Sequence, residues 1–406
     1  MLRRRLAQLG IVAATAAAAW LVASNGVAAA LNAQGDSATA ARLAPDADRL
    51  ARTAETSLQR RDFAAAAALA RHALAISPLQ TRAARVLGMA ELALRRPAQG
   101  LAALDVAARG GWRDTPTQIW LLQAALDTGD YDSALQRGDA LIRRDTATDS
   151  VFALFRQMDG EPGFRRSLLR RLGDTPDWRG LMFLDFRRAA PGELAGLDRL
   201  IAETAHTPHP ATDLELFPLV ERMLELGMTA PAYALWRSKA PPAGWSAGNL
   251  LYDGRFAVAN ARQGAGTPPR FEWWIDPDGT GQASVGPAPN GRGFALTATS
   301  RIGDTTNLAA QALALSPGRY RIAARLFARD ARDWGGFEFA VRCLPQNQEM
   351  PLLEPRVRQQ RLDQLGYGSQ FTIPAGCTRQ DLMLRTTGGS GSASVALGEI
   401  AIQAIG

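Results

Sequence analysis

Residues 129–134 read Gly129-Asp130-Tyr131-Asp132-Ser133-Ala134, and this short turn decides the fold of the first half of the chain. Its glycine ends one helix, Asp130 caps the next helix, and Ala134 is small enough for the two helices to pack closely. Similar turns lie 34 residues apart, at residues 61–63 and 95–97. The sequence therefore predicts a series of helix–turn–helix units.

Small and apolar residues recur with the same period. Two short helices cannot bury their apolar faces alone, whereas a stack of helix pairs can. The pattern predicts a helical solenoid over 47–239, with three recognisable repeats at 47–148 and divergent helical pairs at 149–239. The aligned positions are Ala54, Gly88 and Leu122, then Ala66, Gly100 and Ala134, then Ala73, Ala107 and Leu141.

The three units resemble the tetratricopeptide repeat (TPR) family. The resemblance covers about 100 residues, and the second and third units lack the closing proline that Pro78 supplies in the first. It implies a right-handed solenoid with a concave groove. Members of this family bind peptides or protein partners in that groove, so the resemblance implies a protein partner here.

The composition changes at residues 240–248, where proline and glycine accumulate, and we interpret this segment as a linker. Beyond it, strand-like runs recur at short spacing over 249–406 without intervening helices, and the run at 320–326 alternates apolar and polar residues. This pattern predicts an antiparallel β-sandwich, beginning with a strand near 250–258. The predicted fold class is multidomain, α then β.

Residues 249–256, 271–273, 315–321, 371–375 and 398–402 resemble the ordered motifs of galactose-binding-like jelly rolls, which occur as carbohydrate-binding modules. This resemblance implies a jelly roll and a glycan or second-subunit ligand. The chain departs from the pattern at Ala257, where an acidic residue is usual, and at Glu399, where many modules have aspartate. Such modules use those acids to hold calcium, so calcium is not expected.

Glycan binding requires an aromatic face for the sugar ring and polar side chains around it. Trp274 and Trp334 are the candidates for that face, with Arg332 and Asp333 beside the second. Neighbouring residues of a strand point to opposite sides, so at most one of Trp273 and Trp274 belongs to the core. The alternative is that these tryptophans pack in the core or in an interface.

The chain opens with Met1-Leu2-Arg3-Arg4-Arg5, and no charge follows until after Gly35. This arrangement predicts a signal peptide or an N-terminal membrane anchor over 1–30, followed by a linker over 31–46. Either reading places the body outside the cytoplasm, in the periplasm or an equivalent compartment. Cys343 and Cys377 support this, because an even cysteine count in an exported chain suggests one disulfide bond.

Composition excludes several classes of function. The 406 residues carry a formal net charge of +7, and the basic residues are spread without a run of five, so no nucleic-acid partner is expected. Three histidines and two cysteines are too few for a multi-ligand metal cluster. His206 and His209 share a loop that lacks a third ligand. We predict no metal and no cofactor.

The leading hypothesis is a non-enzymatic exported scaffold or adaptor. It would bind a protein partner through the solenoid and a glycan or second subunit through the sandwich. Analogy with similar two-part proteins suggests cell-envelope or exopolysaccharide assembly. The alternative is a lectin-like glycan-binding protein. A carbohydrate-active enzyme is the third hypothesis, and it would need a convergent acid pair such as Glu272 with Glu338.

Overall fold

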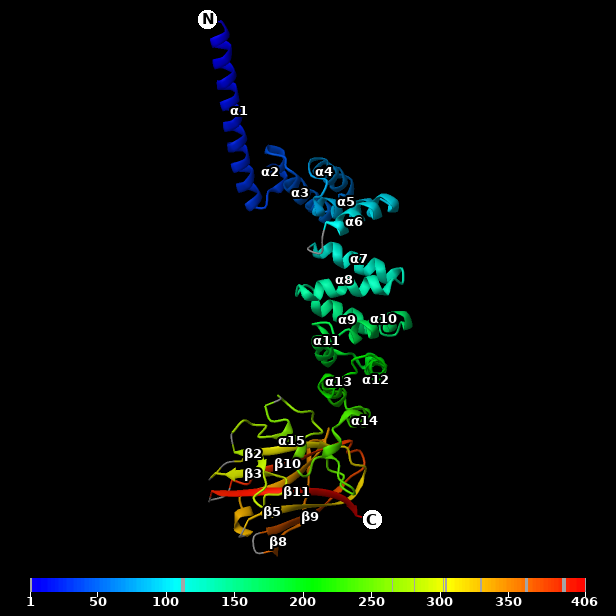
Figure 1. Cartoon of the computed structure of the whole chain (residues 1–406), viewed down its shortest axis with the longest axis vertical. Helices are drawn as coiled ribbons and strands as arrows, with labels where there is room; N and C mark the ends of the chain where they lie inside the picture. The colour runs from blue at the N-terminus through cyan, green and yellow to red at the C-terminus, as the bar shows by residue number, and fades with distance from the viewer. Residues whose placement is uncertain are drawn as a thin grey trace. The chain divides into compact units, whose positions relative to one another are not determined.

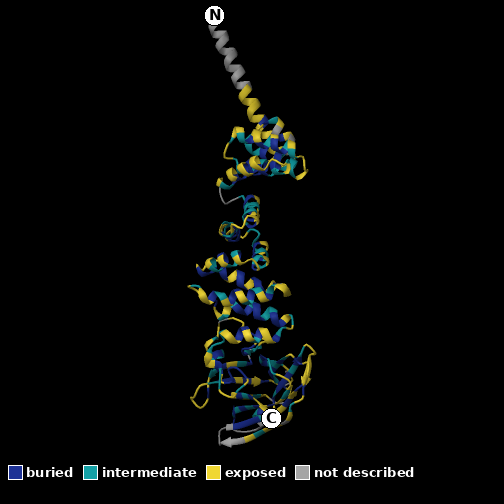
Figure 2. Ribbon diagram, turned by 90° about the vertical axis from the view of Figure 1, so that its right-hand side faces the viewer, coloured by how far each residue is buried: buried dark blue, intermediate teal, exposed yellow. Residues whose placement is uncertain are grey.

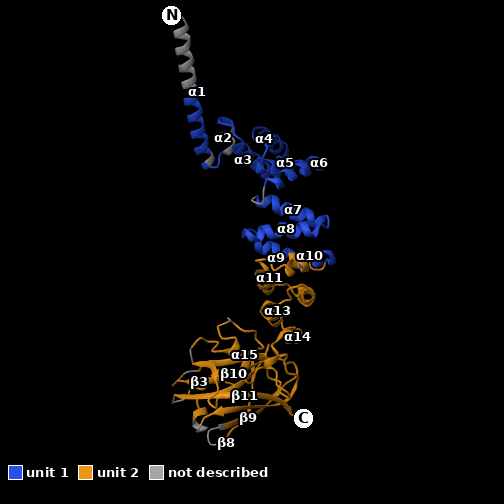
Figure 3. Ribbon diagram, in the orientation of Figure 1, with its two compact units in different colours: residues 1–154, 161–168 blue, residues 155–160, 169–406 orange. Residues whose placement is uncertain are grey.

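The structure is a computed structural model, and Figure 1 shows helices followed by β-strands. It confirms the predicted fold class, an α-helical part followed by an antiparallel β-sandwich. The chain divides into two compact units, residues 1–154 with 161–168 and residues 155–160 with 169–406 (Figure 3). The described residues are 2–110, 114–264, 266–280, 282–301, 303, 305–328, 331–361, 364–388 and 392–405.

The first unit consists of helices joined by tight turns. The turns lie where the 34-residue period places them, because Arg61, Arg95 and Gly129 all adopt a positive φ that ends a helix. Asp62 and Asp130 then accept backbone hydrogen bonds as caps of the following helices. The helices are α1 (Leu2–Ala33), α2 (Ser37–Leu43), α3 (Ala47–Gln59), α4 (Phe63–Ile76), α5 (Thr81–Ala93), α6 (Pro97–Arg109), α7 (Thr115–Asp127) and α8 (Tyr131–Arg143).

Alanines and glycines fill the contacts between these helices. Ala54 of α3, Ala66 of α4 and Ala90 of α5 are all fully buried in one cluster. Among the described residues, no helix is both long enough and apolar enough to cross a membrane.

Further helices lead to the sandwich within the second unit. The predicted capping box is present at the start of α13, where the Thr212 hydroxyl accepts from the Glu215 amide and Glu215 Oε2 accepts from the Thr212 amide at 2.9 Å. Gly227, with a φ of 75°, follows the end of that helix. The helices are α11 (Arg179–Asp185), α12 (Leu194–Glu203), α13 (Asp213–Glu225) and α14 (Thr229–Lys239), while α9 (Thr148–Met158) and α10 (Pro162–Gly173) contribute residues to both units.

Two antiparallel sheets form the sandwich, and their apolar faces enclose a common core that is coloured as buried in Figure 2. The five-stranded sheet has the order β1 (Trp274–Ile275), β4 (Asn307–Leu313), β10 (Arg379–Thr386), β6 (Phe337–Leu344) and β7 (Gln348–Met350). The six-stranded sheet has the order β2 (Ala283–Pro287), β3 (Phe294–Ser300), β11 (Ala393–Ile405), β5 (Gly318–Phe327), β9 (Gln364–Ile373) and β8 (Leu353–Arg361). The predicted disulfide is confirmed, because Cys343 and Cys377 are bonded, with Cα atoms 5.6 Å apart.

The predicted opening strand near 250–258 is wrong. Turns occupy the start of that segment and a short helix, α15 (Ala257–Ala261), its end. Phe256 adopts a left-handed φ of 58°, which reverses the chain and is incompatible with a strand. The Asp253 carboxylate then accepts the backbone amides of Val258 and Ala259, at 3.1 and 2.7 Å. This local cap favours the helix.

An aromatic cluster joins α14 to the sandwich inside the second unit. Trp236 of α14 is 1% exposed, and its ring lies 4.9 Å from the ring of Tyr252 and 5.2 Å from that of Phe271. The ring of Trp245 lies 5.7 Å from Trp236. The last helix therefore packs against aromatic residues that precede the first strand of the sandwich.

The segment 240–248, which we predicted as a linker, takes part in this packing. It contains a short 3-10 helix, η4 (Pro242–Gly244), and the Tyr252 hydroxyl donates to Pro241 O at 2.8 Å. Gly244 lies against the Tyr252 ring so closely that a Cβ would overlap it. The prolines and glycines of this segment therefore form a tight turn that packs against Tyr252.

Candidate ligand-binding pockets of the sandwich

Trp334 forms the wall of an aromatic pocket. It ends the 3-10 helix η5 (Ala331–Trp334), and its ring lies 5.6 Å from the ring of Phe339 and 5.1 Å from that of Tyr367. The side chain is 8% exposed, so it belongs to the core while one edge faces the pocket. The pocket has a volume of about 520 Å³, and Pro351 and Leu352 bound its other side. We call it the aromatic pocket.

Charged groups stand at the mouth of the aromatic pocket. Arg385 Nε lies 2.6 Å from Glu338 Oε1, and Arg385 Nη1 lies 2.6 Å from Glu349 Oε1. The hydrogen bond from Arg385 holds the pKa of Glu349 below its usual range, so this carboxylate stays an acceptor. Burial raises the pKa of Tyr367 to about 12, so its hydroxyl stays protonated. The mouth therefore presents fixed donors and acceptors beside aromatic rings.

Trp274 lies in a different place, a small groove of about 170 Å³ on the five-stranded sheet. It pairs with Ala310 of β4, and the Arg270 guanidinium lies 4.7 Å from its ring centroid. Its indole Nε1 is buried and has no hydrogen-bond partner among the described residues. Burial raises the pKa of Asp381 in the same groove. The alternation prediction holds, because Trp273 beside it points into the core.

The predicted glycan residues are not brought together. Trp274 and Trp334 line separate pockets that share no residue. Asp333 is half-buried in η5 and does not line the aromatic pocket. Arg332 belongs to the same short helix, but its side chain lies outside the described part of the structure. Sequence reasoning missed Tyr367 and Arg385, although both lie on alternating strands that could have indicated them.

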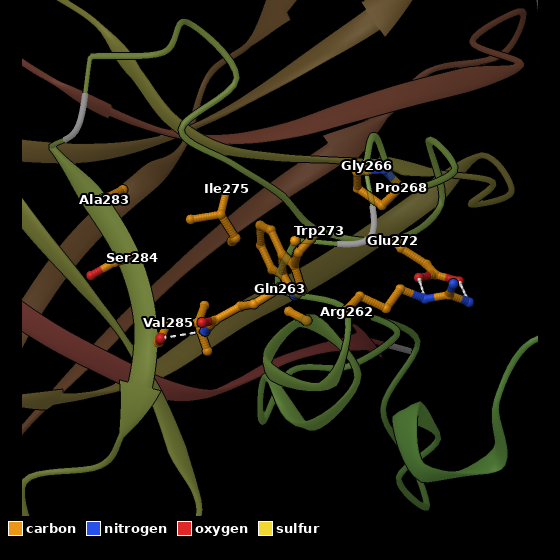
Figure 4. Close-up of a pocket in the computed structure, with 12 residues that line it drawn as sticks. Arg262, Gln263, Gly266, Pro268, Glu272, Trp273, Ile275, Ala283, Ser284 and Val285 are labelled. Atoms are coloured by element: carbon orange, nitrogen blue, oxygen red, sulfur yellow. Dashed lines mark hydrogen bonds and ion pairs between the residues drawn. The ribbon is translucent and has the colours of Figure 1, made fainter.

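A third pocket of about 290 Å³ lies beside α15, where Trp273, Ile275 and Val285 supply apolar walls (Figure 4). Two of its polar side chains already have partners inside the protein. Gln263 Nε2 donates to Val285 O at 2.6 Å, and Trp273 Nε1 donates to Asp253 O at 3.1 Å. These bonds hold the Gln263 and Trp273 side chains in place in the pocket wall.

Glu272 at the edge of this pocket is a buried acid. It is 3% exposed, and its Oε2 lies 2.7 Å from Arg262 Nε, as the dashed lines in Figure 4 mark. Burial raises the pKa of Glu272 to about 7, because lost hydration outweighs the attraction of Arg262. Glu338, its proposed acidic partner for catalysis, lines the aromatic pocket instead. The structure does not bring this acid pair together.

The described residues contain no group of three or more histidine, cysteine, aspartate or glutamate side chains that could hold a metal ion.

Neither a protein-family model nor a curated protein sequence matches the chain. Among solved structures, it is similar to the carbohydrate-binding module TmCBM61 in complex with β-1,4-galactotriose, at 13% identity and a TM-score of 0.25, over 39% of this chain and 99% of that one. The mannan-recognising module TmCBM27 is 12% identical, with a TM-score of 0.23, over 33% of this chain and 89% of that one. The enzymatically active domain of tailspike protein 4 from bacteriophage CBA120 is 14% identical, with a TM-score of 0.21, over 30% of this chain and 18% of that one. TM-scores this low carry no conclusion about function.

Proposed function

We propose that this chain is an exported, non-enzymatic glycan-binding protein whose sandwich receives a sugar ring in the aromatic pocket. The observation that carries the proposal is the combination of the Trp334 and Tyr367 rings with a charged mouth. A sugar ring offers an apolar face and a rim of hydroxyl groups, and this pocket offers a matching surface for each. Its volume of about 520 Å³ is in the range of small-molecule sites.

Export is part of the proposal and is supported by the arginines Arg3, Arg4 and Arg5 before the uncharged N-terminal stretch. The proposal also includes an adaptor role for the helical part of the chain. Its support is the row of helix pairs and the TPR resemblance of their turns. Within the proposal, the glycan anchors the chain in the envelope and the helices remain available for a protein partner.

The test is affinity electrophoresis of the full chain through gels that contain β-1,4-galactan, galactomannan or xylan. We expect retention on at least one of these neutral polysaccharides. Glu338→Gln, at the mouth of the pocket, should weaken the retained interaction by about ten-fold or more, because a hydrogen bond to a charged group contributes about 1.5–3 kcal/mol. Trp334→Phe keeps an aromatic ring but narrows the apolar wall, and it should weaken binding as well.

Glu399→Gln is the matched control. Glu399 is a carboxylate of similar side-chain exposure, 47% against 44% for Glu338, but it lies on β11 of the other sheet. It should leave retention unchanged. The proposal fails if no neutral polysaccharide retains the wild-type chain, or if Glu338→Gln and Trp334→Phe both run like the control.

A further inference from the structure

A strongly basic trough crosses the outer face of the six-stranded sheet. It is the space of about 590 Å³ between β5 and β8, above β9, and we call it the basic trough. Leu365, Tyr367 and Phe371 of β9 point into the core, so the alternate residues Gly366, Gly368 and Gln370 face this outer side. The residues that argue for a ligand are Arg321, Arg325, Arg356, Arg358, Gly366 and Gly368.

Strand register places arginines on both sides of the glycines. Arg325 of β5 and Arg358 of β8 both pair with Gly366 of β9. One step along, Gly368 pairs with Ala323 on one side and Arg356 on the other. Neighbouring strands lie about 4.8 Å apart, so the backbones of Arg325 and Arg358 are roughly 10 Å apart, one on each side of β9. A carboxylate above Gly366 could reach both guanidinium groups.

Neither the packing nor the backbone conformation requires a glycine at position 368. A Cβ added there would meet nothing within 4 Å, and its φ is not positive. Glycine inside a strand costs roughly 0.5–1 kcal/mol relative to alanine, and it often marks a place where a ligand approaches the backbone closely. An empty strand floor between two rows of arginine therefore indicates an occupant that lies directly on the backbone.

Two of the four arginines in the trough have no acidic partner among the described residues. Glu399 is the only acid among the described lining residues, and its Oε1 lies 2.8 Å from Arg325 Nη1. Arg356 also has an interaction partner within the protein. Arg321 and Arg358 form no ion pair with any described residue. Like charges on one face of a sheet repel one another and destabilise the sheet. A bound anionic ligand offsets this repulsion.

We propose that the basic trough binds a linear acidic polysaccharide whose sugar units carry carboxylates, as uronic acids do. Arginine recognises carboxylates with two parallel hydrogen bonds, which suits a uronate better than a point charge would. The exposed Gln370 amide, at the end of the trough, can bind sugar hydroxyl groups. Single-stranded nucleic acid is disfavoured, because the aromatic lining residue, Tyr367, stacks inward on Trp334 and no ring is left for the bases.

This site lies on the outer face of the six-stranded sheet, although it shares Tyr367 with the lining of the aromatic pocket, and it goes beyond the neutral-sugar proposal. The experiment measures binding of polygalacturonate to the full chain by titration calorimetry at several salt concentrations. Carboxyl-reduced polygalacturonate, which keeps the sugar backbone but lacks the charge, is the ligand control. We expect polygalacturonate to bind, and to bind more weakly at higher salt. Carboxyl-reduced polygalacturonate should bind at least about ten-fold more weakly.

Three variants test the trough itself. Gly368→Leu fills the floor, and its Cβ would meet nothing within 4 Å, so it should reduce binding about ten-fold or more while the melting temperature is retained. Arg358→Gln should reduce binding about five- to ten-fold. Arg319→Gln removes the same charge from an exposed position of β5 outside the trough, and it should change binding less than about two-fold.

The proposal is overturned if the wild-type chain does not bind polygalacturonate, or if Arg319→Gln weakens binding as much as Arg358→Gln. It is also overturned if single-stranded DNA or polyglutamate competes as strongly as polygalacturonate, since the trough would then be a general anion surface. Gly368→Leu should leave retention on neutral polysaccharides unchanged. This readout separates failure of the trough from failure of the aromatic pocket.

Discussion

Glu272 is a carboxylate that the fold has removed from water. It lies between Arg262 and the indole of Trp236, whose Nε1 is 3.4 Å from Glu272 Oε1. Such a group could be mistaken for a catalytic acid, because perturbed pKa values gather at active sites. Here the neighbours are an arginine and a core tryptophan, and Arg262 also contacts Asp213 of α13. The acid therefore serves the junction between helices and sandwich.

The pKa of Glu272 predicts how stability depends on pH. The folded value of about 7 exceeds the ordinary value of 4.5, so the folded state binds this proton more tightly than the unfolded state does. The resulting stabilisation is complete below about pH 4.5 and is lost as the pH rises through 7. In the wild-type chain it amounts to roughly 3 kcal/mol.

Urea unfolding between pH 4.5 and 7.5 checks this prediction. Glu272→Gln keeps the shape and cannot ionise, so its free energy of unfolding should fall less over this range than that of the wild type. Glu225→Gln, on the surface of α13, should behave like the wild type. If the free energy of unfolding changed equally with pH in the wild type and in Glu272→Gln, the raised pKa of Glu272 would be contradicted.

Among the elements, the pairing of α5 with α6 shows what the small residues of the 34-residue period do. A Cβ on Gly100 would lie 2.7 Å from Leu92 Cγ and 3.0 Å from Gly88 O. A Cβ on Gly88 would overlap Leu104 Cγ and lie 3.0 Å from Gly100 O. The two helices therefore touch through their backbones at this point. Because only small residues allow such a backbone contact, their recurrence in the sequence could predict the helix pairing.

Gly88→Ala should lower the free energy of unfolding by about 1–3 kcal/mol, because overpacking outweighs the better helix propensity of alanine. Gly180→Ala in α11 is the matched control. Its Cβ would meet nothing within 4 Å, so the same substitution should stabilise by roughly 0.5–1 kcal/mol. Calorimetric unfolding of both variants gives the comparison. A stabilising Gly88→Ala would show that the helices are not in backbone contact.

For the whole molecule, the main surprise is the junction at Trp236. Composition indicated a linker between two independent domains, since proline and glycine usually mark such segments. The structure instead packs Trp236 against Tyr252 and Phe271, so the last helix is in contact with the segment that leads into the sandwich. Sequence could not show this, because the partners lie 16 and 35 residues further along the chain.

Trp236→Ala should therefore destabilise the sandwich, although the residue belongs to a helix. We expect a loss of about 3–5 kcal/mol, the usual cost of removing a large buried aromatic side chain. Near-ultraviolet circular dichroism during unfolding reports on the aromatic cluster directly. Leu181→Ala, at a position of α11 that is 54% exposed, should have little effect. An unchanged sandwich transition in Trp236→Ala would mean that the two parts unfold independently.

The sequence by itself determined the helix pairs, the alternating strands and the disulfide between Cys343 and Cys377. Each of these depends on residues that are close in sequence or on a simple count, and local chemistry such as the Asp130 cap is sufficient. Only the tertiary structure decided which side chains meet. The Tyr367 ring reaches Trp334, and Arg325 faces Arg358 across Gly366, because strand register and sheet order bring distant segments together. A shift of one residue in register would turn every one of these side chains to the other face.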